Sequence, residues 1–74
     1  MSPLSSLKAG AHAIVSEIRA TASRIDKLAA LGILPGVELR VQQVQPVVVI
    51  ECGETVLAIE RELAEGIVVS LVVV

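Results

Sequence analysis

Few side chains in this sequence could do chemistry. There is one histidine, His12, and one cysteine, Cys52, and five of the glutamates lie in the second half of the chain. A metal site built from His12, Cys52 and nearby glutamates would need several ligands that converge on one point. Glu51 and Cys52 are neighbours on an expected strand, so their side chains point to opposite faces. We therefore predict no metal site, an exposed His12 on an edge strand, and a buried, inert Cys52.

Catalysis has no support in the spacing of the polar residues. A nucleophilic cysteine needs a base and an electropositive surrounding, and His12 lies far from Cys52 along the chain. Glu60 and Glu62 are two positions apart, which does not place them on one face of a helical turn. No glycine-rich phosphate loop is present. We predict no catalytic residues, no cofactor and no enzymatic activity.

Composition narrows the possible partners. The 74 residues are 54% hydrophobic, contain no Phe, Tyr or Trp, and carry a net charge of −2. Proteins that bind single-stranded nucleic acids stack bases on aromatic rings, and phosphate-binding surfaces are clearly basic, so we expect no nucleic-acid binding. The charge is uneven, with five basic and three acidic residues in 1–45 but one basic and five acidic residues in 46–74.

The expected cellular context is the cytoplasm. One cysteine allows no internal disulfide, which fits a reducing compartment. The first residues lack a charged region followed by an apolar one, so they do not resemble a signal peptide. No apolar run approaches the roughly 18 residues that cross a bilayer. We therefore expect a soluble protein that does not insert into a membrane.

The elements that position these residues are organised around residues 29–37. The spacing of Ile25, Leu28 and Ala29 predicts an amphipathic helix over 24–31, with Ser23 as its N-terminal cap. Gly32 is expected to end the helix in the left-handed conformation, with Ile33 folding back on its last turn. Residues 35–36, Pro-Gly, then predict a type II turn before a strand.

Alternation of apolar and polar residues predicts a mainly β fold. Residues 1–7 should form a lead-in with a short helical turn, residues 53–54 a hairpin turn, and residues 60–65 one helical turn. We expect a single domain over 1–74, a small, partly open SH3-like barrel of about five strands with one short helix after the first strand and a helical turn before the last. The expected strands are 11–18, 37–42, 47–52, 55–59 and 67–74.

Two apolar segments are candidate interfaces. Leu31 and Leu34 are difficult to bury together in a thin barrel, so they either cover its end or form a partner surface. The strand over 67–74 is almost wholly apolar, and such a strand at a sheet edge would pair with a second copy of the chain. We accordingly predict homo-oligomers through this C-terminal strand at high concentration.

In order and spacing, these landmarks resemble the ferrous iron transport protein A (FeoA) family over nearly the whole chain. The most specific part is the Leu-Gly-Ile-Leu-Pro-Gly sequence of residues 31–36, directly before a strand. The free chain fits the standalone form of the family. The matching residues are Leu4–Gly10 leading into Ala13–Val15, Lys27–Gly36, Leu39 and Val41, Val56–Ile59, Glu62–Ala64 and Ile67–Val69.

The resemblance implies a small cytoplasmic accessory protein of ferrous iron uptake. Its partner would be the membrane transporter FeoB, bound through the cytoplasmic GTP-binding domain of that protein. The partner surface would combine the aliphatic anchors Leu31 and Leu34 with Arg24 and Lys27, which would steer an acidic face toward it. The alternative is a ligand- or metal-sensing module, because the C-terminal domain of iron-dependent repressors is built on a similar SH3-like unit.

Overall fold

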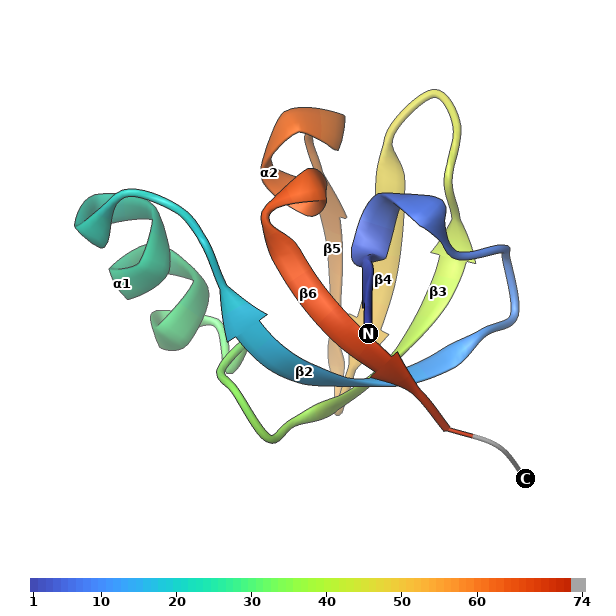
Figure 1. Ribbon diagram of the computed structural model, residues 1–74, viewed down its shortest axis with the longest axis horizontal. Helices are drawn as coiled ribbons and strands as arrows, with labels where there is room; N and C mark the ends of the chain where they lie inside the picture. The colour runs from blue at the N-terminus through green and yellow to red at the C-terminus, as the bar shows by residue number, and fades with distance from the viewer. Residues whose placement is uncertain (73–74) are drawn as a thin grey trace.

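The protein is a six-stranded antiparallel sheet that curls into a partly open barrel, seen in a computed structural model that describes residues 1–72 (Figure 1). The order across the sheet is β1-β6-β2-β3-β4-β5. The mainly β, SH3-like architecture is therefore confirmed, with six strands instead of about five. The strands are β1 (Ser2–Pro3), β2 (His12–Ile18), β3 (Glu38–Gln43), β4 (Val48–Cys52), β5 (Thr55–Ile59) and β6 (Ile67–Leu71).

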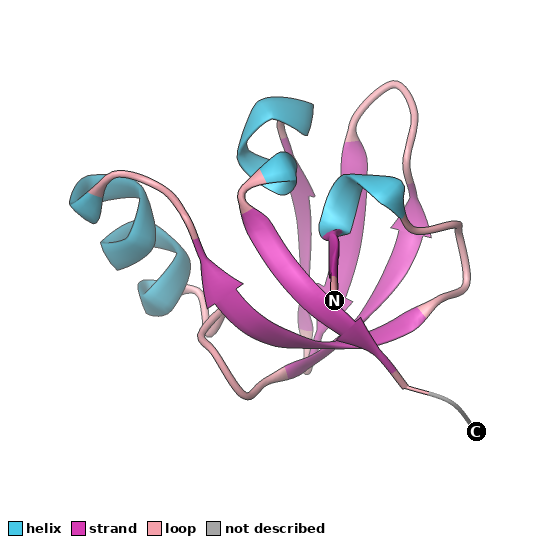
Figure 2. Cartoon of the chain, in the orientation of Figure 1, coloured by secondary structure: helices cyan, strands magenta, loops and turns pink. Residues whose placement is uncertain are grey.

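Within residues 1–72, three short helices accompany the sheet (Figure 2). The 3₁₀ helix η1 (Leu4–Ser6) packs against α2 (Arg61–Glu65), whereas α1 (Ala22–Ala30) stands apart from them, at the left of the view. The helical turns predicted within residues 1–7 and 60–65 are confirmed as η1 and α2. Among the described residues, no helix has both the length and the apolar character needed to pass through a bilayer.

The core is entirely aliphatic, because the sequence contains no Phe, Tyr or Trp, and the strands turn alternate residues inward. Ala13 and Val15 of β2 are buried while His12 and Ile14 are exposed, as the alternation predicted. The register shifts after Val15 in β2 and after Val41 in β3, and such bulges increase the local twist of a sheet. The buried residues are Leu4, Leu7, Ala13, Val15, Leu28, Ile33, Leu39, Val41, Val48, Ile50, Ile59, Ala64, Ile67 and Val69.

The two ends of the chain differ from the prediction. Ser2 and Pro3, expected as part of a polar lead-in, form β1 opposite Val69 and Val68 of β6. Strand β6 ends at Leu71, and residues 73–74 of the predicted strand lie outside the described residues. A two-residue strand leaves almost no hydrophobic pattern in a sequence, so only the tertiary pairing reveals it.

The expectation that the C-terminal strand forms a sheet edge is wrong. Strand β6 lies inside the sheet between β1 and β2, so both of its sides are paired. The apolar character of Ile67 and Val69 therefore reflects burial within the sheet and not an exposed edge, whereas Leu71 at the end of the strand is 57% exposed. The expected edge-strand position of His12 is also wrong, because β2 lies between β6 and β3.

Candidate functional site

An open apolar groove of about 200 Å³ lies between α1 and the segment that joins β5 to α2. We call it the α1–β5 groove. Leu28 and Ile59 are buried beneath it, Leu57 and Leu63 are half-buried, and Leu31 is 44% exposed. The groove thus offers aliphatic surface to a partner. Its lining residues are Arg24, Lys27, Leu28, Leu31, Leu57, Ala58, Ile59, Glu60 and Leu63.

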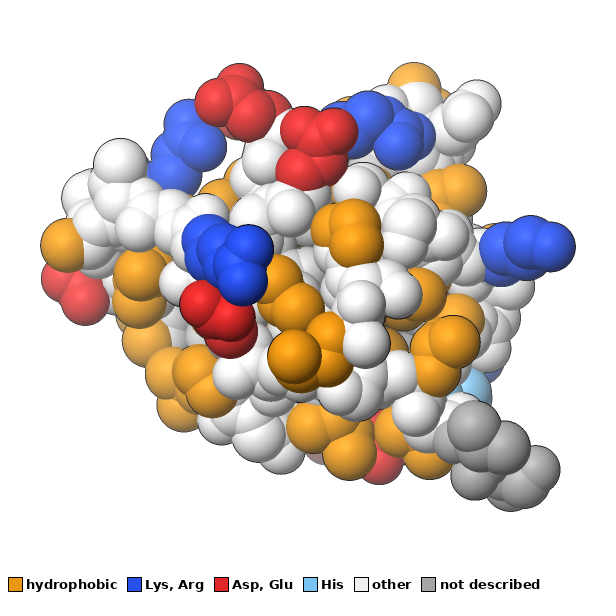
Figure 3. Space-filling model, in the orientation of Figure 1, with side chains coloured by type: hydrophobic (Ala, Val, Ile, Leu, Met, Phe, Trp, Pro, Cys, Tyr) orange, Lys and Arg blue, Asp and Glu red, His pale blue; other side chains and the backbone are white. Residues whose placement is uncertain are grey.

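Charged side chains stand at the rim of the groove. Arg24 and Lys27 on α1 and Glu60 on the opposite wall are all exposed, and none of the three forms an ion pair with another described residue. In the space-filling view, charged side chains gather along the upper margin of the molecule, over α1 and α2 (Figure 3). An apolar floor with a charged, solvated rim is the usual anatomy of a protein–protein interface.

The start of α1 is fixed by Thr21. Its backbone is extended, and its side-chain Oγ1 accepts a hydrogen bond of 3.3 Å from the backbone N–H of Arg24. The prediction that Ser23 caps the helix is therefore wrong, because Ser23 already lies inside α1. Both residues are good cap formers, and the helix begins two residues earlier than predicted, at Ala22, which makes Thr21 the cap.

The end of α1 follows the prediction. Gly32 has a φ of +90°, its N–H donates to the carbonyl of Ala29 at 2.9 Å, and the N–H of Ile33 donates to the carbonyl of Leu28 at 2.8 Å. This is the Schellman motif, which commonly places a hydrophobic residue against the last turn of the helix. Ile33 is fully buried there, and Leu31 is left at the edge of the groove.

The turn after α1 is tied to the sheet. Gly36 has a φ of +96° and the N–H of Val37 donates to the carbonyl of Leu34 at 3.2 Å, which confirms the predicted type II turn. The N–H of Gly36 also donates to the carbonyl of Val15 at 2.7 Å. This anchoring fixes Leu34 on the surface at 42% exposure.

Three of the four residues predicted for the partner surface come together in the groove. Arg24, Lys27 and Leu31 all line it, whereas Leu34 lies on the adjacent turn and does not. The sequence analysis did not predict the second wall, which β5 and α2 supply. No local pattern connects α1 with β5, because the closeness of the two elements follows from the curl of the whole sheet.

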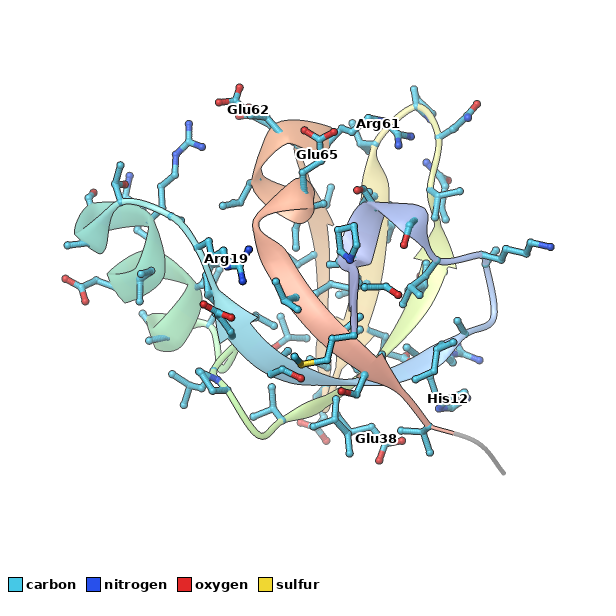
Figure 4. All side chains as sticks on the ribbon, in the orientation of Figure 1. His12, Arg19, Glu38, Arg61, Glu62 and Glu65 are labelled. Carbon is cyan, nitrogen blue, oxygen red and sulfur yellow. The ribbon has the colours of Figure 1, made fainter. Side chains whose placement is uncertain are left out.

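The candidate metal ligands are dispersed. His12 and Glu38 approach each other on the outer face of the sheet, with His12 Nδ1 3.5 Å from Glu38 Oε2 (Figure 4). Glu51 is 3.2 Å from Arg40, and Cys52 is half-buried with its Sγ 3.8 Å from the carbonyl of Gly32. Among residues 1–72, no group of three or more His, Cys, Asp or Glu side chains is placed to hold a metal ion.

A second hollow of about 370 Å³ lies on the side of the N-terminus. It is lined in part by Arg19 and Glu65, and Arg19 Nε donates to the carboxylate of Glu17 at 3.1 Å. This hydrogen bond and the charge of Glu17 raise the pKa of Arg19, so its guanidinium stays charged and satisfied within its own pair. Both side chains of this pair are largely exposed, so the pair contributes little to stability.

The model of the FeoA domain family matches residues 2–71 of the chain. No curated protein matches the sequence closely enough to count as a relative.

Several solved structures are similar to this fold. A FeoA protein from Chlorobium tepidum is 32% identical with a TM-score of 0.90, and the match covers 96% of this chain and 70% of the other. An iron uptake regulatory protein, also described as FeoA, is 28% identical with a TM-score of 0.86 and 96% of each chain covered. The T. acidophilum protein IdeR shares the fold at 24% identity and a TM-score of 0.86, with 93% of this chain and 33% of IdeR covered.

Proposed function

The chain belongs to the FeoA domain family, and we propose that it serves ferrous iron uptake by docking its α1–β5 groove on the cytoplasmic GTP-binding domain of a FeoB-type transporter. Family membership gives the accessory role in iron uptake. The groove supplies the means of docking. In this proposal the protein works in the cytoplasm and acts by binding its partner, not by catalysis.

The observation that carries the proposal is the combination of an open aliphatic groove with unpaired cations at its rim. Leu31 is 44% exposed beside the buried Leu28 and Ile59, so a partner side chain that enters the groove buries apolar surface on all sides. Arg24 and Lys27 stand at the entrance without an acidic partner among the described residues. Such cations steer an acidic face toward the groove and act mainly on the rate of association.

The size of the groove fits a small anchor. A volume of about 200 Å³ accommodates one or two aliphatic side chains and is small for a drug-sized ligand, since ligand pockets span roughly 300–1,000 Å³. A few buried anchors carry most of the energy in protein interfaces. We therefore expect the transporter to contribute an aliphatic side chain that contacts Leu31, Leu57 and Leu63.

The direct test measures binding of the isolated cytoplasmic domain of the transporter by calorimetry, with and without guanine nucleotide. Leu31→Glu should lower the affinity about tenfold or more, because a carboxylate would replace an anchor in the groove. Ile14→Glu is the matched control, since Ile14 is 40% exposed on β2 and lies outside the groove. No binding in any nucleotide state, or equal losses in both variants, would contradict the proposal.

The alternative, a metal-sensing module, is favoured by one observation, the fold shared with the T. acidophilum IdeR. Calorimetry with ferrous iron distinguishes the two functions. A sensing module would give a saturable heat that His12→Ala removes, because His12 Nδ1 and Glu38 Oε2, 3.5 Å apart, are near enough to contact the same ion. Equal weak heats from both proteins would exclude this alternative for His12.

A further inference from the structure

One edge of the sheet is open to a further strand. Strand β5 is the last strand of the sheet and pairs only with β4, and its residues 57–59 lie along the α1–β5 groove. At the opposite edge, β1 has only two residues and one of them is Pro3. Strand β5 has five residues, Thr-Val-Leu-Ala-Ile, with no proline and no charge. Natural proteins usually blunt such an edge unless it is used for pairing.

The free hydrogen-bonding groups of this edge can be assigned. Residues 53–54 form a two-residue hairpin turn in which Gly53 has a φ of +60°, so Cys52 and Thr55 exchange the first pair of ladder bonds. Thr55, Leu57 and Ile59 then bond β4. The N–H and C=O groups of Val56 and Ala58 consequently point outward, and no turn, cap or side-chain hydrogen bond uses them within the described part of the chain.

The side chains on this edge carry a charge pattern. Val56 is 57% exposed and Ala58 is also exposed, and Glu54 and Glu60, which flank the strand at its two ends, are exposed as well. The exposed side chains along this edge, from residue 54 to residue 60, are therefore acidic, apolar, apolar and acidic in that order. If a second copy paired antiparallel about Leu57, Glu54 of each copy would lie opposite Glu60 of the other. Like charges directly opposite each other destabilise a strand pair.

We propose that β5 binds an extended segment of another protein by strand addition, and that this segment carries Lys or Arg at two positions six residues apart. These basic residues would pair with Glu54 and Glu60. Between them, the side chains facing the groove would be aliphatic, because Leu57 and Leu63 line it and Arg24 and Lys27 repel further cations. The inference rests on the proposed docking role and names how the docked segment is recognised: main-chain bonds give affinity and alternate side chains give specificity.

The probe is the peptide Lys-Val-Thr-Leu-Thr-Val-Lys, with Glu-Val-Thr-Leu-Thr-Val-Glu as its charge-reversed control. Binding is followed by NMR shifts and by amide hydrogen exchange at Val56 and Ala58. We expect the basic peptide to bind and to slow the exchange of both amides, and the acidic peptide to bind at least tenfold more weakly. The double substitution Glu54→Lys, Glu60→Lys should reverse that preference.

A backbone variant tests the main-chain bonds. Ala58→Pro removes an outward N–H from an edge strand, a place where proline is tolerated, and Leu57 before it is already extended. It should keep the far-UV circular dichroism spectrum and weaken the basic peptide about tenfold, the size expected for one lost hydrogen bond and its distorted neighbour.

Three results would overturn the strand-addition inference: no binding of the basic peptide, binding that leaves the Val56 and Ala58 amides unprotected, or self-association of the native chain through β5. The transporter domain separates this inference from the proposed function. If that domain binds and Leu31→Glu weakens it but Ala58→Pro does not, the docking function stands and strand addition is wrong. If the basic peptide binds as described and the transporter domain does not, strand addition stands and the choice of partner is wrong.

Discussion

Two sides of the molecule are packed in different ways. Where η1, α2 and β6 meet, Leu4, Ala64 and Ile67 are completely buried. On the side of α1, only Leu28 of that helix is buried, and an open groove remains between α1 and the wall formed by β5 and Leu63. A chain of 74 residues has little apolar surface to spare, so a groove left unfilled on one side indicates a surface available for binding.

The space around a glycine also differs between the two sides. A Cβ on Gly66, between α2 and β6, would lie 2.2 Å from the carbonyl oxygen of Arg19, and that Arg19 donates its N–H to the carbonyl of Gly66 at 2.7 Å. A Cβ on Gly32, after α1, would meet no atom within 4 Å. At Gly66 a larger residue is excluded by lack of space, whereas at Gly32 only the positive φ disfavours one.

The largest expected effect contrasts two neighbours in the turn after α1. Ile33→Ala should lower the free energy of unfolding by about 3 kcal/mol, because Ile33 is fully buried and its loss leaves a cavity. Leu34→Ala should change it by less than about 0.5 kcal/mol, since Leu34 is 42% exposed. Urea unfolding followed by circular dichroism measures both. Equal losses would contradict the division between core and surface within this turn.

The next effect tests the closed side. Gly66→Ala should destabilise the fold by about 2 kcal/mol, because the added methyl group forces α2 and the end of β2 apart. Gly32→Ala should cost about 1 kcal/mol through its positive φ alone. If the order of the two in urea unfolding were reversed, the contrast in tightness between the two sides would be wrong.

A smaller effect concerns the helix that forms the wall of the groove. Thr21→Ala should cost about 1 kcal/mol, because it removes the side-chain acceptor for the N–H of Arg24. Ser23→Ala is the control and should be neutral or slightly stabilising, since Ser23 lies inside α1 and alanine favours helix. Thermal unfolding of the two variants side by side decides which residue caps α1.

The smallest effect separates the groove from the surface around it. Leu34→Glu should leave stability nearly unchanged, because Leu34 is exposed. Since Leu34 lies next to the groove but does not line it, we expect this variant to weaken binding of the transporter domain by about threefold, well below the effect of Leu31→Glu. An equal or larger loss for Leu34→Glu would move the centre of the docking surface from the groove to the turn.

Local chemistry predicted most of the fold. The Gly32 helix end and the Gly36 turn depend on backbone angles that glycine supplies, so both can be predicted from a few neighbouring residues. The inward positions of Leu39 and Val41 follow from strict alternation. These features require no knowledge of the rest of the chain.

Features that depend on distant segments could not be predicted in the same way. Strand β1 exists because Ser2 and Pro3 meet β6 from the other end of the chain, and the same pairing places β6 inside the sheet. The sequence identified one wall of the candidate site, Arg24, Lys27 and Leu31, because they belong to one helix and its end. The other wall requires the position of β5 in the sheet order, which no local pattern encodes.

The short strand β1 acts as a cover for the outer side of β6. It pairs with Val68 and Val69, whose own strand is apolar except for Ser70. Proteolytic trimming of the first three residues would uncover this side while leaving the groove intact. The shortened chain would then present the outer edge of β6 to a second molecule, which favours aggregation or dimerisation by joining of the two sheets.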